Sequence, residues 1–78
     1  MRCIIAGQSF YLQPSDVERA MVGVKPEPIQ GHFVEVGRQK YPVKQVGAVI
    51  SGQRPSDFTV QEVRLALTHL GFACGSAS

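Results

Sequence analysis

The chain has 78 residues, 44% of them hydrophobic and 18% charged, which is typical of a folded globular chain and excludes a disordered one. One small domain fits this length. We expect it to span residues 1–78, with frayed ends at 1–2 and 75–78 and too thin a core for a deep substrate cavity. The net charge of +2 is too small by itself to indicate a nucleic-acid partner. No apolar run approaches the ~20 residues that span a bilayer, and the run at the N-terminus is too short for a secretory signal. We therefore expect a cytoplasmic protein that does not enter membranes.

Residues 2–12 are rich in Ile, Phe and Tyr and predict strand structure interrupted at Gly7. A helix then follows, because Ser15 to Glu18 has the spacing of a capping box. Its predicted buried face comprises Val17, Ala20, Met21 and Val24.

Two prolines, Pro26 and Pro28, break that helix. Residues 31–36 predict a strand that buries its valine face, residues 37–38 a tight turn, and residues 39–41 the return strand of a hairpin.

Pro42 suits the first position of a second helix, which Gly52 ends. The predicted inner face of this helix is Val43, Val46, Val49 and Ile50. After a loop at 53–58, a capping box at Thr59 opens a third helix, which Gly71 stops. Its inner face is predicted to be Val60, Val63, Ala66, Leu67 and Leu70, and residues 72–74 form a strand or a packed coil. The fold class is α+β, with three helices, a small β-hairpin and a helix–loop–helix core that is loosely winged-helix-like.

No constellation of residues indicates catalysis. Ser9, His32 and Asp16 make a triad only on paper, without a strained elbow or an oxyanion loop. Glu35 and Lys40 lie too far apart for the acid-x-lysine pattern of a nuclease. The two histidines, His32 and His69, have no neighbouring ligands, so we expect no enzyme, no metal and no cofactor.

The two cysteines lie near opposite ends of the chain. A disulfide between Cys3 and Cys74 would clamp the termini. The interpretation we favour is two reduced thiols in small buried side chains.

Charge segregation is the strongest functional signal. Between Arg38 and Arg54 there are four cations and no acid, whereas all six acids lie outside this segment. The cations and nearby polar side chains are of types that contact phosphates and base edges, and the N-terminus of the third helix offers free N–H groups. The competing interpretation is an ordinary solvated polar face. The predicted DNA-binding residues are Arg38, Lys40, Tyr41, Lys44, Arg54, Thr59, Gln61 and Arg64.

Residues 34–72 carry four short motifs: Gly37-Arg38, Tyr41-Pro42-Val43-Lys44, Asp57-Phe58 and Leu70-Gly71-Phe72. This stretch resembles a module of McrA-like, modification-dependent HNH restriction endonucleases. The resemblance implies a DNA-binding accessory domain in which Arg38, Tyr41 and Lys44 are conspicuous site positions, and the nuclease residues themselves are absent. For each of these three a structural role is the alternative: a solvated turn residue, a core anchor, and a lysine whose stem covers the sheet.

Two hypotheses follow. The first is a non-catalytic module or small regulator that contacts duplex DNA. The second is a protein-interaction module, such as a phage or toxin–antitoxin type regulator of a partner enzyme, which an exposed apolar patch around Phe10, Tyr11 and Phe33 would favour. The oligomeric state stays open.

Overall fold

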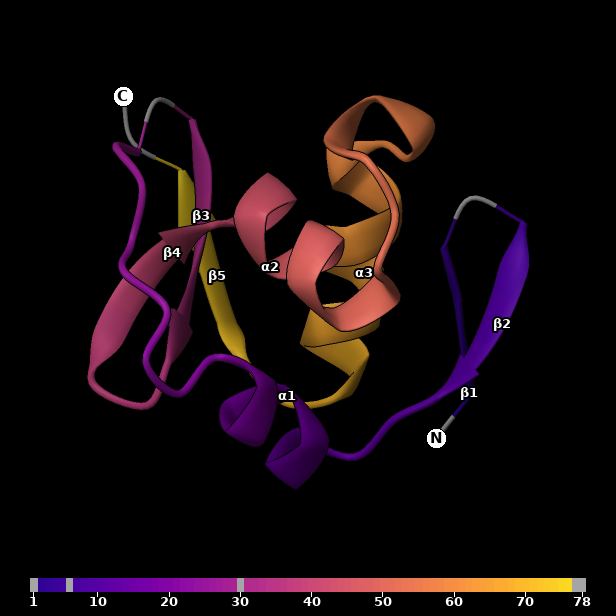
Figure 1. Cartoon of the computed structure of the whole chain (residues 1–78), viewed down its shortest axis with the longest axis horizontal. Helices are drawn as coiled ribbons and strands as arrows, with labels where there is room; N and C mark the ends of the chain where they lie inside the picture. Colours follow the sequence, from indigo (N-terminus) through magenta and orange to yellow (C-terminus); the bar gives the residue numbers. More distant parts are fainter. Residues whose placement is uncertain (1, 6, 30, 77–78) are drawn as a thin grey trace.

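The computed structural model describes residues 2–5, 7–29 and 31–76 (Figure 1). In chain order its elements are β1 (Arg2–Ile5), β2 (Gln8–Tyr11), α1 (Pro14–Ala20), β3 (His32–Val36), β4 (Gln39–Pro42), α2 (Val43–Ser51), the 3₁₀ turn η1 (Pro55–Asp57), α3 (Val60–His69) and β5 (Ala73–Ser76). Within the described ranges the fold is therefore α+β, with three α-helices and two small antiparallel sheets.

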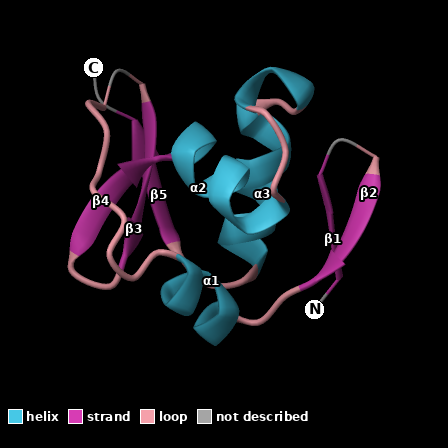
Figure 2. Cartoon of the chain, in the orientation of Figure 1, coloured by secondary structure: helices cyan, strands magenta, loops and turns pink. Residues whose placement is uncertain are grey.

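Helices α2 and α3 lie between the two sheets (Figures 1 and 2). The three-stranded sheet, in the order β4-β3-β5, covers one side of the helix pair, and the β1–β2 hairpin lies on the other side against α3. Helix α1 closes the lower end in this view. The two sheets thus bury the apolar faces of a central helical layer.

The predicted hairpin at 31–41 is confirmed. Strand β3 pairs antiparallel with β4, and the turn between them contains Gly37 at φ 64°, a conformation that glycine adopts without strain. Val34 and Val36 are buried and Glu35 is exposed, as the alternation predicts.

The C-terminal strand was only partly foreseen. Residues 73–76 form β5, which pairs with the opposite edge of β3 in the register His32↔Ser76 to Glu35↔Ala73. Residues 75 and 76, which we expected to be frayed, are therefore paired, and Arg2 is likewise paired with Tyr11. Residues 1, 77 and 78 lie outside the described part of the chain.

The N-terminal strand region forms a hairpin of its own. Its register runs from Arg2↔Tyr11 to Ile5↔Gln8. The inner face carries Cys3 and Ile5, which are buried, while the outer face carries residues that are all exposed. Those outer residues are Arg2, Ile4, Ser9 and Tyr11.

The hydrophobic core joins both sheets to all three helices. Valines supply much of it because they suit both a strand face and the tight helix–sheet contacts. The buried members are Cys3, Ile5, Val17, Met21, Val34, Val36, Tyr41, Val43, Val46, Phe58, Val63, Ala66, Leu67 and Leu70.

Helix α1 begins earlier than predicted. Pro14 takes its first turn, so the cap moves back to Gln13, whose N–H donates to Oδ2 of Asp16 at 2.8 Å. The predicted capping box at Ser15 is therefore wrong. Of the predicted buried face, Val17 and Met21 are buried, Ala20 is exposed, and Val24 lies beyond the end of the helix and is half-buried.

Helix α2 differs from the prediction at two positions. Pro42 is its N-cap and the last residue of β4, one position before the helix starts. Val49 is partly exposed, and the buried stripe instead follows Val43, Val46 and Gly47, an i, i+3, i+4 pattern. Gly52 ends the helix at φ 70° as expected.

Candidate functional site

The loop before α3 and the first turns of that helix bring four predicted site residues onto one part of the surface. Thr59 caps α3, and its Oγ1 accepts a hydrogen bond from the N–H of Glu62 at 3.2 Å. Gln61 and Arg64 follow on the outer face of α3, and both are exposed. Arg54 is exposed immediately before η1. This group of Arg54, Thr59, Gln61 and Arg64 is called the α3 site below.

Lys44 lies in the first turn of α2, and its Nζ donates hydrogen bonds to the backbone carbonyls of Pro55 and Phe58. The same Nζ lies 4.8 Å from the centroid of the Phe58 ring, in a cation–π contact. The amine is therefore engaged inside the protein, where it fixes the loop that carries Arg54 and leads to Thr59. Sequence reasoning missed this role, because no motif reports which carbonyls a lysine will reach.

The β3–β4 hairpin carries three more predicted site residues. Arg38 is exposed in the turn, and Lys40 is exposed with its Nζ 5.2 Å from the centroid of the Phe33 ring. Lys40 also lies directly opposite Glu35 in the strand register. In Figure 1 this turn and η1 lie at opposite ends of the molecule, so the hairpin cations do not join the α3 site.

Tyr41 is buried, and its hydroxyl is used inside the protein. It lies 3.2 Å from the carbonyl oxygen of Val24 and 3.1 Å from Oε1 of Gln39. The phenol has only one proton to donate, so its O–H can donate to the carbonyl of Val24 but not to Gln39 at the same time. With the Gln39 amide in the flipped orientation, the amide NH₂ donates to the hydroxyl oxygen of Tyr41 instead. Tyr41 thus holds the linker between α1 and β3 (residues 21–31) against the sheet. This is the role of a core anchor, the structural alternative to a binding role that the sequence left open.

A shallow depression of about 400 Å³ lies between that linker and the β3–β4 turn. Its charged lining residues are Glu18, Lys25 and Arg38. Cations and an acid share this depression, so it has no strong preference for one sign of charge.

The acid-free segment of the sequence is not acid-free in space. Strand pairing brings Glu35 directly opposite Lys40, while Asp57, exposed in η1, already lies three residues from Arg54 in the sequence. The expected segregation of charge therefore weakens on folding. The α3 site remains a mixed surface with two arginines at its edges.

Within the described ranges, none of the two histidines and two cysteines lies in a cluster of candidate metal ligands. In the described ranges no group of three or more His, Cys, Asp or Glu side chains could hold a metal ion. His32 contacts Ser76 instead, with 2.9 Å between Nδ1 and Oγ.

Both cysteines are free, as the sequence interpretation favoured. Cys3 is buried, and burial raises the pKa of its thiol because the thiolate loses solvation. Cys74 is partly buried, with its Sγ 3.7 Å from Oγ1 of Thr68.

The apolar residues suggested for a protein interface do not form one patch. Tyr11 is 79% exposed on the outer face of the β1–β2 hairpin, whereas Phe10 packs against the core on the inner face. Phe33 lies in the other sheet, against Gly75. Ile4, 53% exposed, and Leu65, 62% exposed, instead line a second depression of about 260 Å³ between β1 and α3.

Residues 1–78 match the model of the SCO5918-like family. The chain belongs to this family. No curated protein and no solved structure matches it. Among the described residues, no helix has the length and apolar character required to cross a bilayer.

Proposed function

We propose that this member of the SCO5918-like family is a non-catalytic module that binds duplex DNA through the α3 site. The observation that carries the proposal is the exposed outer face of α3, which presents Gln61 in its first turn and Arg64 one turn further along. A polar helix face of this kind suits the major groove, with the arginines on phosphates and the glutamine on a base edge. Lys44 supports binding indirectly by fixing the loop.

In this proposal α2 and α3 act as the helix–loop–helix pair, and the likeness to a winged helix is limited to this pair because the β3–β4 turn lies away from the α3 site. Arg54 and Arg64 supply the main phosphate contacts. Arg38 and Lys40 contribute only if the duplex extends to the β3–β4 hairpin, because its turn lies at the opposite end of the molecule from η1 (Figure 1).

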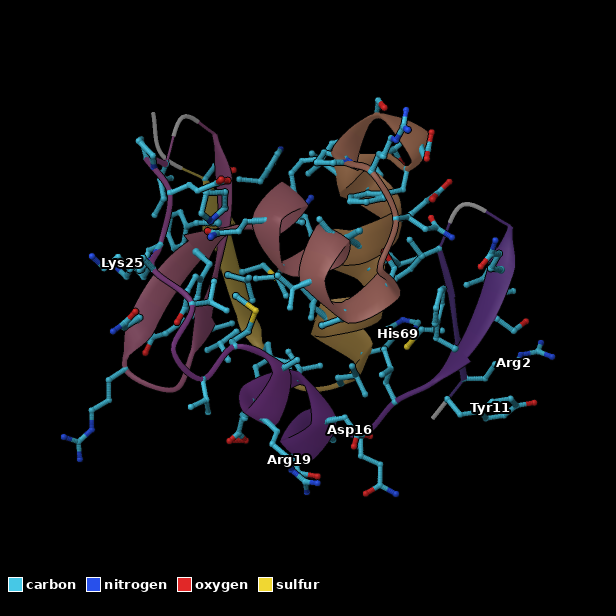
Figure 3. All side chains as sticks on the ribbon, in the orientation of Figure 1. Arg2, Tyr11, Asp16, Arg19, Lys25 and His69 are labelled. Atoms are coloured by element: carbon cyan, nitrogen blue, oxygen red, sulfur yellow. The ribbon has the colours of Figure 1, made fainter. Side chains whose placement is uncertain are left out.

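The test is fluorescence anisotropy with a duplex of about two helical turns, between roughly 50 and 200 mM salt. The double variant Arg54→Gln/Arg64→Gln should bind more weakly and lower the salt slope by about 0.9 for each lost phosphate contact. Arg19→Gln on α1 is the matched control, because Arg19 is exposed at the far lower end of the molecule (Figure 3).

The proposal fails if saturating DNA at low salt shifts no backbone amide signal between residues 54 and 64. It also fails if the double variant and Arg19→Gln bind equally well.

A second candidate function is binding to a partner protein through the depression between β1 and α3. Ile4 and Leu65 expose apolar surface there, surrounded by Arg2, Glu62 and His69, which is the arrangement of a small interface core with a polar rim. A protein recovered by the wild type after nuclease treatment and lost with Leu65→Lys, while Arg54→Gln retains it, would favour this function over DNA binding.

A further inference from the structure

We propose that β2 is a pairing edge for a second copy of this chain, so that two β1–β2 hairpins join into one four-stranded antiparallel sheet. This inference goes beyond DNA binding and does not depend on it. Among residues 2–5, 7–29 and 31–76, β2 pairs with β1 along one edge, and no strand pairs with its other edge. In Figure 1, β2 is the outermost element on its side of the molecule.

The backbone of β2 has hydrogen-bonding groups available on that outer edge. Two residues separate Ile5 from Gln8, so those two form the closing hydrogen-bonded pair of the hairpin. Hydrogen-bonded and non-hydrogen-bonded pairs alternate, which directs Phe10 toward β1 and both Ser9 and Tyr11 away from it. No backbone partner for Ser9 or Tyr11 on that side appears within the described part of the chain.

This edge carries no charged residue and no proline, so its short length of four residues is the one common protection against pairing that its sequence offers. Natural edge strands are blunted by lysine, proline or other charged residues. Strand β4 carries both Lys40 and Pro42, whereas β2 reads Gln-Ser-Phe-Tyr without a charge or a proline. An uncharged strand does not repel its own copy.

The occupant that fits is a second β2, because an antiparallel pairing centred on Phe10 is self-complementary. Two-fold symmetry sets Ser9 opposite Tyr11 of the second copy, and vice versa, and all four backbone N–H and C=O pairs then have partners. It also sets the two half-buried Phe10 rings opposite each other on the inner face, where each covers apolar surface of the other.

The exposed side chain of Tyr11 also supports pairing at this edge. It is 79% exposed and projects from the hairpin away from the helices (Figure 3). In the paired sheet it lies beside the strand of the second copy and loses part of that exposure. The contact is a single strand pair, so the dimer is weak, with a dissociation constant of about 0.1–1 mM.

The experiment is sedimentation equilibrium over a concentration series, combined with amide hydrogen exchange. Ser9→Glu/Tyr11→Glu sets glutamates opposite each other across the proposed pair and should weaken dimerisation by at least about tenfold, since directly opposed like charges destabilise strand pairs. Within the hairpin the new glutamate at position 11 faces Arg2, so the variant should keep its fold. Adding the Ser9→Lys chain to this variant should restore association as a heterodimer.

The matched control is Ile4→Glu, on the same outer face but in β1 and away from the edge. It should leave the dimer unchanged. In the wild type, exchange at the Ser9 and Tyr11 amides should slow as concentration rises, while the Phe10 amide is already protected in the dilute monomer.

Three results overturn the proposal. One is a wild-type chain that stays monomeric beyond about 1 mM, the weak limit of such interfaces. Another is a dimer that Ile4→Glu disrupts as much as the double variant, which would place the contact on the outer face. The third is a dimer whose Ser9 and Tyr11 amides exchange at the same rate at all concentrations.

Discussion

Replacing Lys44 with methionine tests whether this lysine fixes the α2–α3 loop. The change keeps the length of the side chain and removes the amine that binds the carbonyls of Pro55 and Phe58 and lies 4.8 Å from the Phe58 ring centroid. A hydrogen bond from a charged donor contributes about 1.5–3 kcal/mol, and a cation–π contact at an exposed site about 0.5–1 kcal/mol. The carbonyl of Pro55 is exposed and regains water, so only one hydrogen bond counts in full.

The expected cost of Lys44→Met is therefore at least about 2 kcal/mol, or a fall of at least roughly 8–16 °C in the melting temperature of a domain of this size. Urea denaturation followed by far-ultraviolet circular dichroism measures it. Lys40→Met is the matched control. That lysine is exposed and contacts only the Phe33 ring among the interactions described above, so the loss should stay below about 1 kcal/mol.

If the two methionine variants unfold at the same urea concentration, Lys44 does not stabilise the loop. A second readout separates the structural role from a direct phosphate contact. If Lys44 acts only on the loop, Lys44→Met should speed amide exchange across residues 54–59 in the absence of DNA.

Four further predictions concern packing, the linker after α1, the pH dependence of stability and the reactivity of the thiols. Gly47→Ala should destabilise the domain by about 1–2 kcal/mol in urea denaturation despite the higher helix propensity of alanine, because the new Cβ would lie 2.7 Å from Cγ2 of Val63 and 2.8 Å from Cε1 of Phe58; a stabilised variant would contradict this packing. Tyr41→Phe should cost about 1 kcal/mol and speed amide exchange in residues 21–26, whereas unchanged exchange there would show that the hydroxyl does not hold the linker. The pKa of the Cys3 thiol is raised in the folded state, so the unfolded chain loses this proton at a lower pH than the folded chain does. The free energy of unfolding should therefore fall as the pH rises above the ordinary thiol pKa of 9.0. Cys3→Ser should remove that fall, and an unchanged pH profile in this variant would contradict the prediction. In the folded protein iodoacetamide should modify Cys74 before Cys3, since only Cys74 is partly exposed.

Most of the local structure could be predicted from the amino-acid sequence. Apolar residues at helical spacing placed α2 and α3, and the cap at Thr59 and the left-handed Gly52 set two of their ends, because capping and φ preferences act within a few residues. Alternation in residues 33–36 identified the buried face of β3 for the same reason.

The contacts between distant parts of the chain depend on the tertiary structure. The sequence could not assign the N-terminal strands to a sheet of their own, nor place β5 beside β3, because these pairings depend on how the whole chain packs. It predicted Tyr41 and Lys44 as site residues but could not see that their polar atoms reach partners 17 and 14 positions away. Side-chain hydrogen bonds over such separations form only once the core has brought the elements together. Packing of the core also separates the two ends of the cationic segment between Arg38 and Arg54, because the β3–β4 turn and the loop before η1 lie at opposite ends of the folded molecule.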